Sequence, residues 1–149
     1  MLNNKIPPVI VVLFFAGIMA LIAHYSVIDF TAFITYLAAS LVIIGCVFCI
    51  AGIASFKIAN TTVNPNKPEQ ASKLITSGIY KISRNPMYVG FAFILAGWGV
   101  WLSSLWALLC IIGFIAYLTF FQIIPEERAL TKLFGEEFTA YKARVKRWL

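Results

Sequence analysis

The sequence predicts an all-α integral membrane protein with about four transmembrane helices. Hydrophobic residues make up 61% of the 149-residue chain and charged residues only 12%, and the mean hydropathy is +0.88. A soluble domain is only about 45–50% apolar, and a soluble fold of this length could not bury so much apolar surface. The apolar residues also form long blocks, each close to the roughly 20 residues that a helix needs to cross a bilayer.

Four apolar blocks are the predicted spans, at about residues 6–23, 33–56, 87–102 and 105–124. The third is short and only Ser103 and Ser104 separate it from the fourth, so these two should form a tight helical hairpin. The second is long enough to tilt or to continue past the membrane. The first could instead be a signal peptide, but Leu21 fits the small-residue rule for cleavage poorly, which favours a retained span. The whole chain, 1–149, is therefore expected to be one membrane-embedded domain.

The polar segments indicate how the chain is oriented. With four spans, the N-terminus, a loop over residues 57–86 and a tail over 125–149 lie on one side, and all twelve basic residues fall there. The positive-inside rule makes that side cytoplasmic, which predicts a bacterial inner-membrane protein with a cytoplasmic active face. Basic residues that flank spans meet anionic lipid headgroups, so the net charge of +6 requires no nucleic-acid partner.

The tail is predicted to be helical and amphipathic. Pro125 with Glu126 and Glu127 resembles a helix start, because proline suits the first turn and acids suit the positive end of the helix dipole. Apolar residues then recur at spacings of three and four on both sides of Gly135: Leu130, Leu133, Phe134, Phe138, Tyr141, Val145 and Trp148. Such a tail would lie on the membrane surface or fold back over the cytoplasmic loop.

Small residues and cysteines inside the spans have structural explanations. The second span has Ala38, Gly45 and Gly52 at steps of seven, and the third has Gly90 and Gly97, a pattern that permits close helix packing or dimerisation and leaves the oligomeric state open. The C-x-x-C of the second span is expected to pack rather than to bind zinc, because no second pair accompanies it. No metal site is predicted.

Two polar clusters could support chemistry. The first precedes the third span and places Tyr80, Arg84, Asn85 and Tyr88 around Pro86, at a helix N-terminus that suits a carboxylate or phosphate. An interfacial anchor is the alternative explanation, since Tyr and Arg are common at headgroup level.

The second cluster spans 122–127, where the fourth span ends. Adjacent carboxylates point about 100° apart on a helix, so Glu126 and Glu127 cannot both face one ligand atom. One could hold a ligand ammonium or ribose hydroxyls while the other pairs with Arg84 or with a tail Arg. Simple helix N-terminal acids remain the alternative.

The ordered motifs resemble the isoprenylcysteine carboxyl methyltransferase family and its bacterial relatives. They are Thr-Ser-Gly-Ile-Tyr at 76–80, Ser-Arg-Asn-Pro-Met-Tyr-Val-Gly at 83–90, Glu-Glu at 126–127 and Phe-Gly-Glu-Glu-Phe at 134–138. Gly-Trp-Gly at 97–99 together with the Glu pair is also similar to the related phospholipid methyltransferases. The resemblance covers roughly residues 60–148.

The resemblance implies S-adenosylmethionine as cofactor and assigns candidate residues. With Ser72 at the edge of the site, the implied cofactor-binding residues are Lys73, Leu74, Ile75, Tyr80, Asn85, Pro86, Met87, Tyr88 and Glu126. Arg84, Gln122 and Glu127 are implied to contact substrate or to support the site, and no catalytic residue is assigned. Asn85 replaces a family His, and Gln122 replaces an Arg that is thought to meet the substrate carboxylate, which puts a prenylcysteine substrate in doubt.

The predicted function is methyl transfer from S-adenosylmethionine to a lipophilic or membrane-associated acceptor with a carboxylate, amine or thiol, at the cytoplasmic face. Aligning donor and acceptor in a water-poor pocket supplies most of what this reaction needs. Two alternatives are an NADPH-dependent membrane reductase of the sterol-reductase type and a non-catalytic membrane subunit. The acceptor itself is not predicted.

Overall fold

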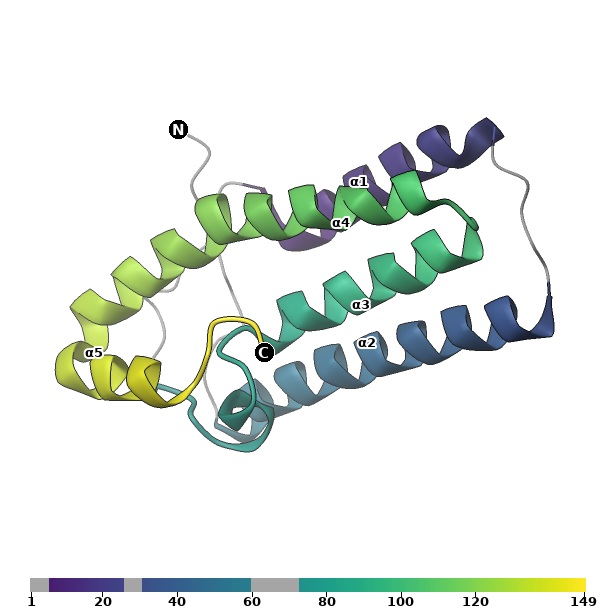
Figure 1. The fold of residues 1–149 in the computed structure, drawn as a ribbon. Coiled ribbons are helices and arrows are strands. Elements are labelled where there is room, and N and C mark those ends of the chain that lie inside the picture. Colours follow the sequence, from purple (N-terminus) through teal and green to yellow (C-terminus); the bar gives the residue numbers. More distant parts are fainter. Residues whose placement is uncertain (1–5, 26–30, 60–72) are drawn as a thin grey trace.

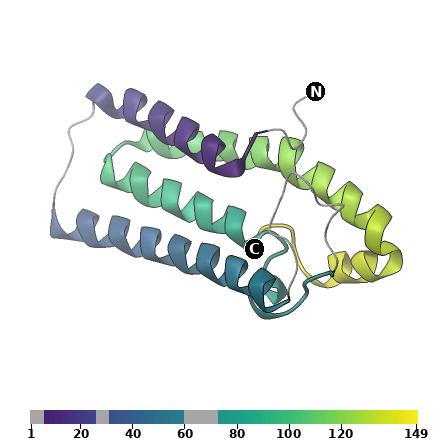
Figure 2. The ribbon, with the colours of Figure 1, turned by 180° about the vertical axis from the view of Figure 1, so that it is seen from behind.

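The computed structural model describes residues 6–25, 31–59 and 73–149, and this part of the chain contains helices and no strand. The first four long helices lie side by side, and the fifth continues from the fourth beyond the bundle (Figures 1 and 2). They are α1 (Pro8–Ile22), α2 (Ala32–Ile58), α3 (Pro86–Trp101), α4 (Leu105–Leu118) and α5 (Ile124–Arg144). Short 3-10 turns, η1 (Ala23–Tyr25) and η3 (Gly78–Lys81), and a π-helical turn, η4 (Thr119–Ile123), complete the described elements. The turn-rich start of the predicted loop, 60–68, and Ser72 lie outside the described residues.

The predicted small-residue stripes form the contact between α2 and α3. Ala38, Gly45 and Gly52 are the buried residues of α2. A Cβ atom added at Gly90 would lie 2.6 Å from the carbonyl oxygen of Gly45, and one at Gly97 would lie 2.7 Å from that of Ala38. Backbone atoms cannot move aside locally, so the two helices approach this closely only because these positions lack side chains.

A second layer, α1 and α4, packs on α3 and encloses the core. Met19, Leu95, Phe114 and Leu118 are at most 1% exposed. In the turn that joins α3 to α4, the hydroxyl of Ser104 accepts a hydrogen bond from the backbone amide of Ala107 at 3.3 Å and so caps α4. Because α1 contributes buried side chains to this core, it is an integral part of the bundle.

Two helical runs are long and apolar enough to cross a membrane, namely the 27 residues of Ala32–Ile58 and the 40 residues of Leu105–Arg144. Pro8–Ile22 and Pro86–Trp101 are apolar but shorter. Many large apolar side chains point outward, among them Leu13, Ile43 and Trp106 with 66%, 62% and 72% exposure. An outer surface of this kind is suited to lipid.

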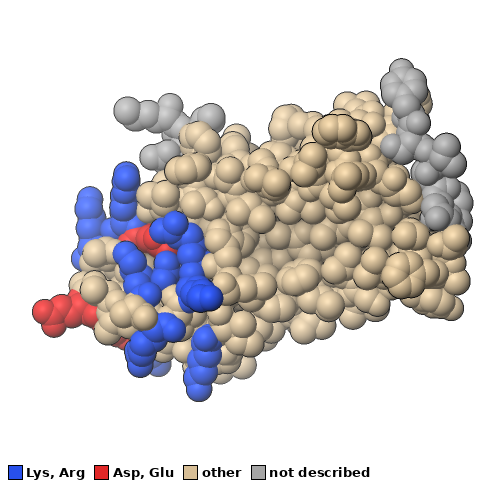
Figure 3. Space-filling view, viewed as in Figure 1, with Lys and Arg blue, Asp and Glu red and all other residues tan. Residues whose placement is uncertain are grey.

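Charged side chains gather at one end of the molecule. Figure 3 shows the blue and red residues together at one tip, while the body beyond them is uncharged in this view. The described charged residues come from the end of α2, the segment 73–84 and the tail after Ile124. This distribution agrees with the predicted collection of polar segments on one side.

The fourth span continues into the tail without an intervening loop. Helix α5 has Pro125 in its first turn, as predicted, but it follows the π turn directly, and the amide of Ile124 bonds to the carbonyl of Thr119. A wider π turn accommodates a proline, which lacks an amide donor and would crowd an α-helical backbone. Glu126 and Glu127 therefore do not sit at a free helix N-terminus, and the simple helix-dipole explanation for them is weakened.

The tail helix bends at Gly135, whose φ is +50°. Glycine adopts this left-handed conformation without the steric penalty of a Cβ atom. The second half of α5 turns back (Figure 1), and its Phe138 and Tyr141 are 2% and 3% exposed. The hydroxyl of Tyr141 donates to the carbonyl of Tyr80 at 2.7 Å. Of the two predicted placements of the tail, this contact matches the one folded back over the loop segment.

Candidate active site

The two polar clusters meet where α3 begins and α5 leaves the bundle. The hydroxyl of Tyr88 donates to Oε1 of Glu126 at 2.7 Å, across 38 residues of sequence. Tyr88 is 4% exposed, whereas Glu126 is only partly buried. A buried phenol thus donates to the carboxyl of a residue that is itself partly buried.

The segment before α3 is held by a local turn. The hydroxyl of Ser83 accepts a hydrogen bond from the amide of Asn85 at 3.1 Å, and Ser83 is fully buried. Pro86 then opens α3, where its fixed φ suits the first helical turn. Tyr88 follows on the first turn and is thereby directed inward toward α5.

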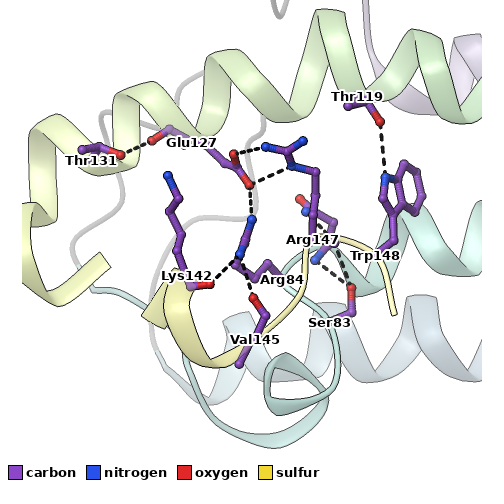
Figure 4. A network of polar contacts seen from close by, with 10 residues as sticks. Ser83, Arg84, Thr119, Glu127, Thr131, Lys142, Val145, Arg147 and Trp148 are labelled. Carbon is purple, nitrogen blue, oxygen red and sulfur yellow. Dashed lines mark hydrogen bonds and ion pairs between the residues drawn. The ribbon is translucent and has the colours of Figure 1, made fainter. Parts of the chain in front are cut away.

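The side chain of Glu127 points away from that of Glu126 and pairs with two arginines (Figure 4). Its Oε1 accepts from Arg84 at 2.6 Å and its Oε2 accepts from Arg147 at 2.7 Å. Arg84 also donates to the carbonyls of Lys142 at 3.1 Å and Val145 at 2.7 Å. The predicted pairing of one acid with Arg84 or a tail Arg is thus seen at Glu127, whereas Glu126 faces Tyr88 and its binding of a ligand stays a prediction.

The last residues of the chain cross the start of α3 and tie it to the α4–α5 junction (Figure 4). The carbonyl of Arg147 accepts from Nδ2 of Asn85 at 2.9 Å and from the hydroxyl of Ser83 at 3.4 Å. The indole of Trp148 donates to the hydroxyl of Thr119 at 3.2 Å. The sequence predicts that Arg84 or a tail Arg pairs with one of the two acids, but it does not single out Arg147. Arg147 lies three residues beyond the end of a bent helix, where no periodic pattern identifies it.

Electrostatics separate the two acids further. Burial raises the pKa of Glu126 to about 8; the repulsion from Glu127 adds to this, and the hydrogen bond from Tyr88 opposes it. Burial also acts on Glu127, but its hydrogen bonds with Arg147 and Arg84 outweigh it and lower the pKa below the usual value. Burial raises the pKa of Tyr80 as well, with smaller contributions from Tyr141 and Glu126. Glu126 is thus a carboxyl that would gain most from a cationic or hydroxyl-bearing ligand.

Three of the candidate residues have structural contacts instead of facing this pair. The side chain of Met87 packs against Gly52 of α2, so it contributes to the helix contact. Pro86 is fully buried in the bundle. The side-chain Nδ2 of Asn85 donates to the backbone carbonyl of Arg147 in the tail.

Gln122 is fully buried on η4 and donates through Nε2 to the carbonyl of Ile6 at 2.7 Å. Its Oε1 is also buried and has no hydrogen-bond partner among the described residues. The resemblance implies that Gln122 contacts substrate or supports the site, which stays a prediction, and nothing in the local sequence indicates its hydrogen bond to the residue that precedes α1.

The candidate cofactor segment before Tyr80 varies in exposure. Lys73 is exposed, Leu74 is partly buried and Ile75 is 8% exposed. Within the described part of the chain, none of the three makes a hydrogen bond with Tyr88 or Glu126. Tyr80 is buried, and its ring meets that of Phe56 edge-on at 5.7 Å. The assignment of Lys73, Leu74 and Ile75 to cofactor binding stays a prediction.

Comparison with known proteins identifies the family. The profile of the phospholipid methyltransferase family matches residues 33–137, which include both polar clusters up to the bend of α5. The chain belongs to the phospholipid methyltransferase family. The described part of the chain also contains two helices that are long and apolar enough to cross a membrane, which fits a family of membrane proteins.

Curated relatives extend this finding. This family member is 34% identical over 126 residues to the protein-S-isoprenylcysteine O-methyltransferase of Rattus norvegicus, which covers 75% of the chain, and 36% identical over 83 residues to that of Xenopus laevis, which covers 54%. It is also 43% identical over 63 residues, 42% of its length, to the whole of an uncharacterized protein of Haemophilus influenzae. The predicted resemblance to this group is confirmed. The aligned parts are 40% and 28% of the rat and frog enzymes, and no solved structure gives a significant match.

Proposed function

We propose that this chain transfers a methyl group from S-adenosylmethionine to a lipophilic or membrane-associated acceptor at the cytoplasmic face of a bacterial inner membrane. The observation that supports this most strongly is the contact between Tyr88 and Glu126. It joins the two motif clusters in space, and it holds a carboxyl that burial has largely removed from water.

The residues present fit the proposed cofactor. Burial raises the pKa of the Glu126 carboxyl to about 8, and the ion pairs among the described residues involve Glu127 and not Glu126. S-adenosylmethionine carries an ammonium group and ribose hydroxyls that such a carboxyl would bind. When bound, the cofactor supplies an electrophilic methyl group on its sulfonium. Among the described residues, no cluster of His, Cys, Asp and Glu could hold a metal ion, and the proposed reaction needs none.

The chain's own residues would bind and orient rather than exchange bonds. Tyr88 fixes the Glu126 carboxyl in direction, and the network of Glu127 with Arg84 and Arg147 holds the α3 entry against α5. The buried side chains around them limit water, which favours an aligned displacement. An amine acceptor would have to lose a proton before attack, whereas a carboxylate or thiolate would not.

The proposed topology has α1, α2, α3 and the α4–η4 run crossing the bilayer, with the Glu126 end on the cytoplasmic side. The collection of charged residues at one tip supports this (Figure 3), since basic residues remain on the cytoplasmic side. The short α3 packs between α2 and α4, and the short α1 packs against α4 and α3, which supports their sharing the same membrane layer.

The test is calorimetric binding of S-adenosylhomocysteine to the detergent-purified protein, with NADPH as a parallel titrant. We expect saturable binding of S-adenosylhomocysteine, lost in Glu126→Ala and retained in Glu136→Ala, a matched exposed acid on the same helix. Binding of NADPH alone would favour a reductase, and binding of neither would favour a non-catalytic subunit.

A further inference from the structure

The helical run from α4 to α5 changes its rotational register at the π turn η4. The amide of Ile124 donates to the carbonyl of Thr119, five residues earlier, whereas an α-helix bonds residues four apart. A single π turn takes up one extra residue, so the residues after it are rotated by about 100° from their places in a continuous α-helix. The direction of each side chain at the start of α5 therefore depends on η4.

The burial pattern shows this shift. Leu118 is fully buried, and in a continuous α-helix its direction would return at the third to fourth residue after it. Instead, Phe121 is 37% exposed, and the fully buried residues are Gln122 and Ile123. The first buried residue of α5 is Glu127, four positions beyond Ile123. The buried stripe is thus displaced by one residue between α4 and α5.

The register decides which acid meets which partner. As observed, the hydroxyl of Tyr88 donates to Glu126, and Glu127 pairs with Arg84 and Arg147. In the α register each residue would move into the place now held by the next residue along the chain. The proline at position 125 would then face the phenol, to which its side chain offers no acceptor. Glu126 would turn to the two arginines.

Pro125 is the residue that favours the π register, because it follows the π hydrogen bond directly. In the α register its nitrogen could not donate to the carbonyl four residues earlier, and its ring would clash with that carbonyl. The second half of α5 does not prevent a rotation of the first half. The bend at Gly135 separates the two halves, with a φ of +50° and no atom within 4 Å of an added Cβ, so the backbone there has room to adjust.

We propose that Pro125 is a positioning residue, which holds η4 in the π register and so directs Glu126 to Tyr88 and Glu127 to the arginines. This inference rests on the proposed function, in which Glu126 binds the cofactor. It makes the place of each acid depend on its distance along the chain from η4.

The experiment compares the unmodified protein with variants that change the register alone or together with the acids. Pro125→Ala permits the α register without supplying an acid to face Tyr88. It should weaken calorimetric binding of S-adenosylhomocysteine by at least about tenfold, as the loss of a hydrogen bond to a charged group allows. Pro125→Glu combined with Glu127→Ala moves the acid pair back by one residue, which matches the α register. This double variant should recover most of the lost affinity.

Thermal unfolding in detergent without ligand gives a second readout. Glu127→Ala alone removes the carboxylate partner of Arg84 and should lower the unfolding temperature. In the double variant Glu126 replaces that partner, so the unfolding temperature should return toward that of the unmodified protein. A loss of packing at Pro125 would not produce this recovery. Pro8→Ala is the matched control, because Pro8 opens α1 directly after the non-helical Pro7, and it should leave the affinity unchanged.

Unchanged S-adenosylhomocysteine affinity in Pro125→Ala would overturn the inference. A double variant that unfolds at the same temperature as Glu127→Ala, or at a lower one, would also overturn it, and this comparison stands even if Pro125→Ala does not fold. Failure of the proposed function is distinguishable, because S-adenosylhomocysteine would then not bind the unmodified protein, while the unfolding temperatures would still report the register.

Discussion

Cofactor binding should depend on the ionisation of Glu126. Its pKa of about 8 means that it is mostly protonated in the free protein at neutral pH, with about ten neutral molecules for each ionised one at pH 7. A ligand ammonium pairs with the ionised form, so binding must displace the proton. The apparent affinity for S-adenosylhomocysteine should therefore increase about tenfold per pH unit from pH 6 to near pH 8 and then level off, which is about 1.4 kcal/mol per unit.

The assay is titration calorimetry in two buffers of different ionisation enthalpy. At pH 7 the difference in observed heat should correspond to release of about 0.9 proton per bound ligand, the fraction of Glu126 that is neutral when its pKa is about 8. Glu127 is a natural internal control, because its pKa is lowered by its two Arg partners and it stays ionised across this range. In Glu126→Gln, binding should be weaker and release no proton.

A flat affinity between pH 6 and pH 8, with no proton release by the unmodified protein, would refute this reasoning, because the carboxyl would then either be ionised already or not meet the ligand.

The stability of the free protein should change with pH in the opposite direction to its affinity for the ligand. The folded-state pKa of Glu126 lies above the ordinary 4.5, so the free protein holds an extra proton between these values. Its stability should fall as pH rises from about 5 to 8, and Glu126→Gln should remove that dependence.

Three further substitutions test the packing around the site by thermal unfolding in detergent. Glu127→Ala removes the carboxylate partner of Arg84, whose side chain is 10% exposed, and should lower the free energy of unfolding by about 3–5 kcal/mol. Arg147→Ala removes a more exposed side chain, at 35%, and should lower it less; a larger loss in Arg147→Ala than in Glu127→Ala would contradict the network. Gly90→Ala drives a Cβ atom into the backbone of α2 and should cost about 1–3 kcal/mol, whereas Gly17→Ala, with no atom within 4 Å, should be neutral or stabilising. Tyr141→Phe leaves a carbonyl without its donor and should cost about 1–3 kcal/mol; an unchanged unfolding temperature would show that water replaces it.

Part of the site could be predicted from local sequence. The start of a helix at Pro86, with Tyr88 in its first turn, follows from the preference of proline for that position, and the structure confirms it. The helical period required Glu126 and Glu127 to diverge, and the structure has them bonded to different partners. Arg147 could not be singled out, since its place depends on how far the chain turns back after Gly135.

The sequence by itself determined the class of protein, the helical order and the gathering of charge at one end, because hydrophobic length and charge placement act locally and add along the chain. Glycines seven residues apart on both helices predicted close helix packing but left open whether it occurs within the chain or in a dimer, and the structure shows that they form the contact of α2 with α3. Only the tertiary structure decided which partner each acid takes and which atom of Gln122 remains free. Those outcomes depend on contacts between residues tens of positions apart, whose geometry is set by the π turn before Pro125 and the bend at Gly135, and no local pattern specifies the angle at which two helices meet.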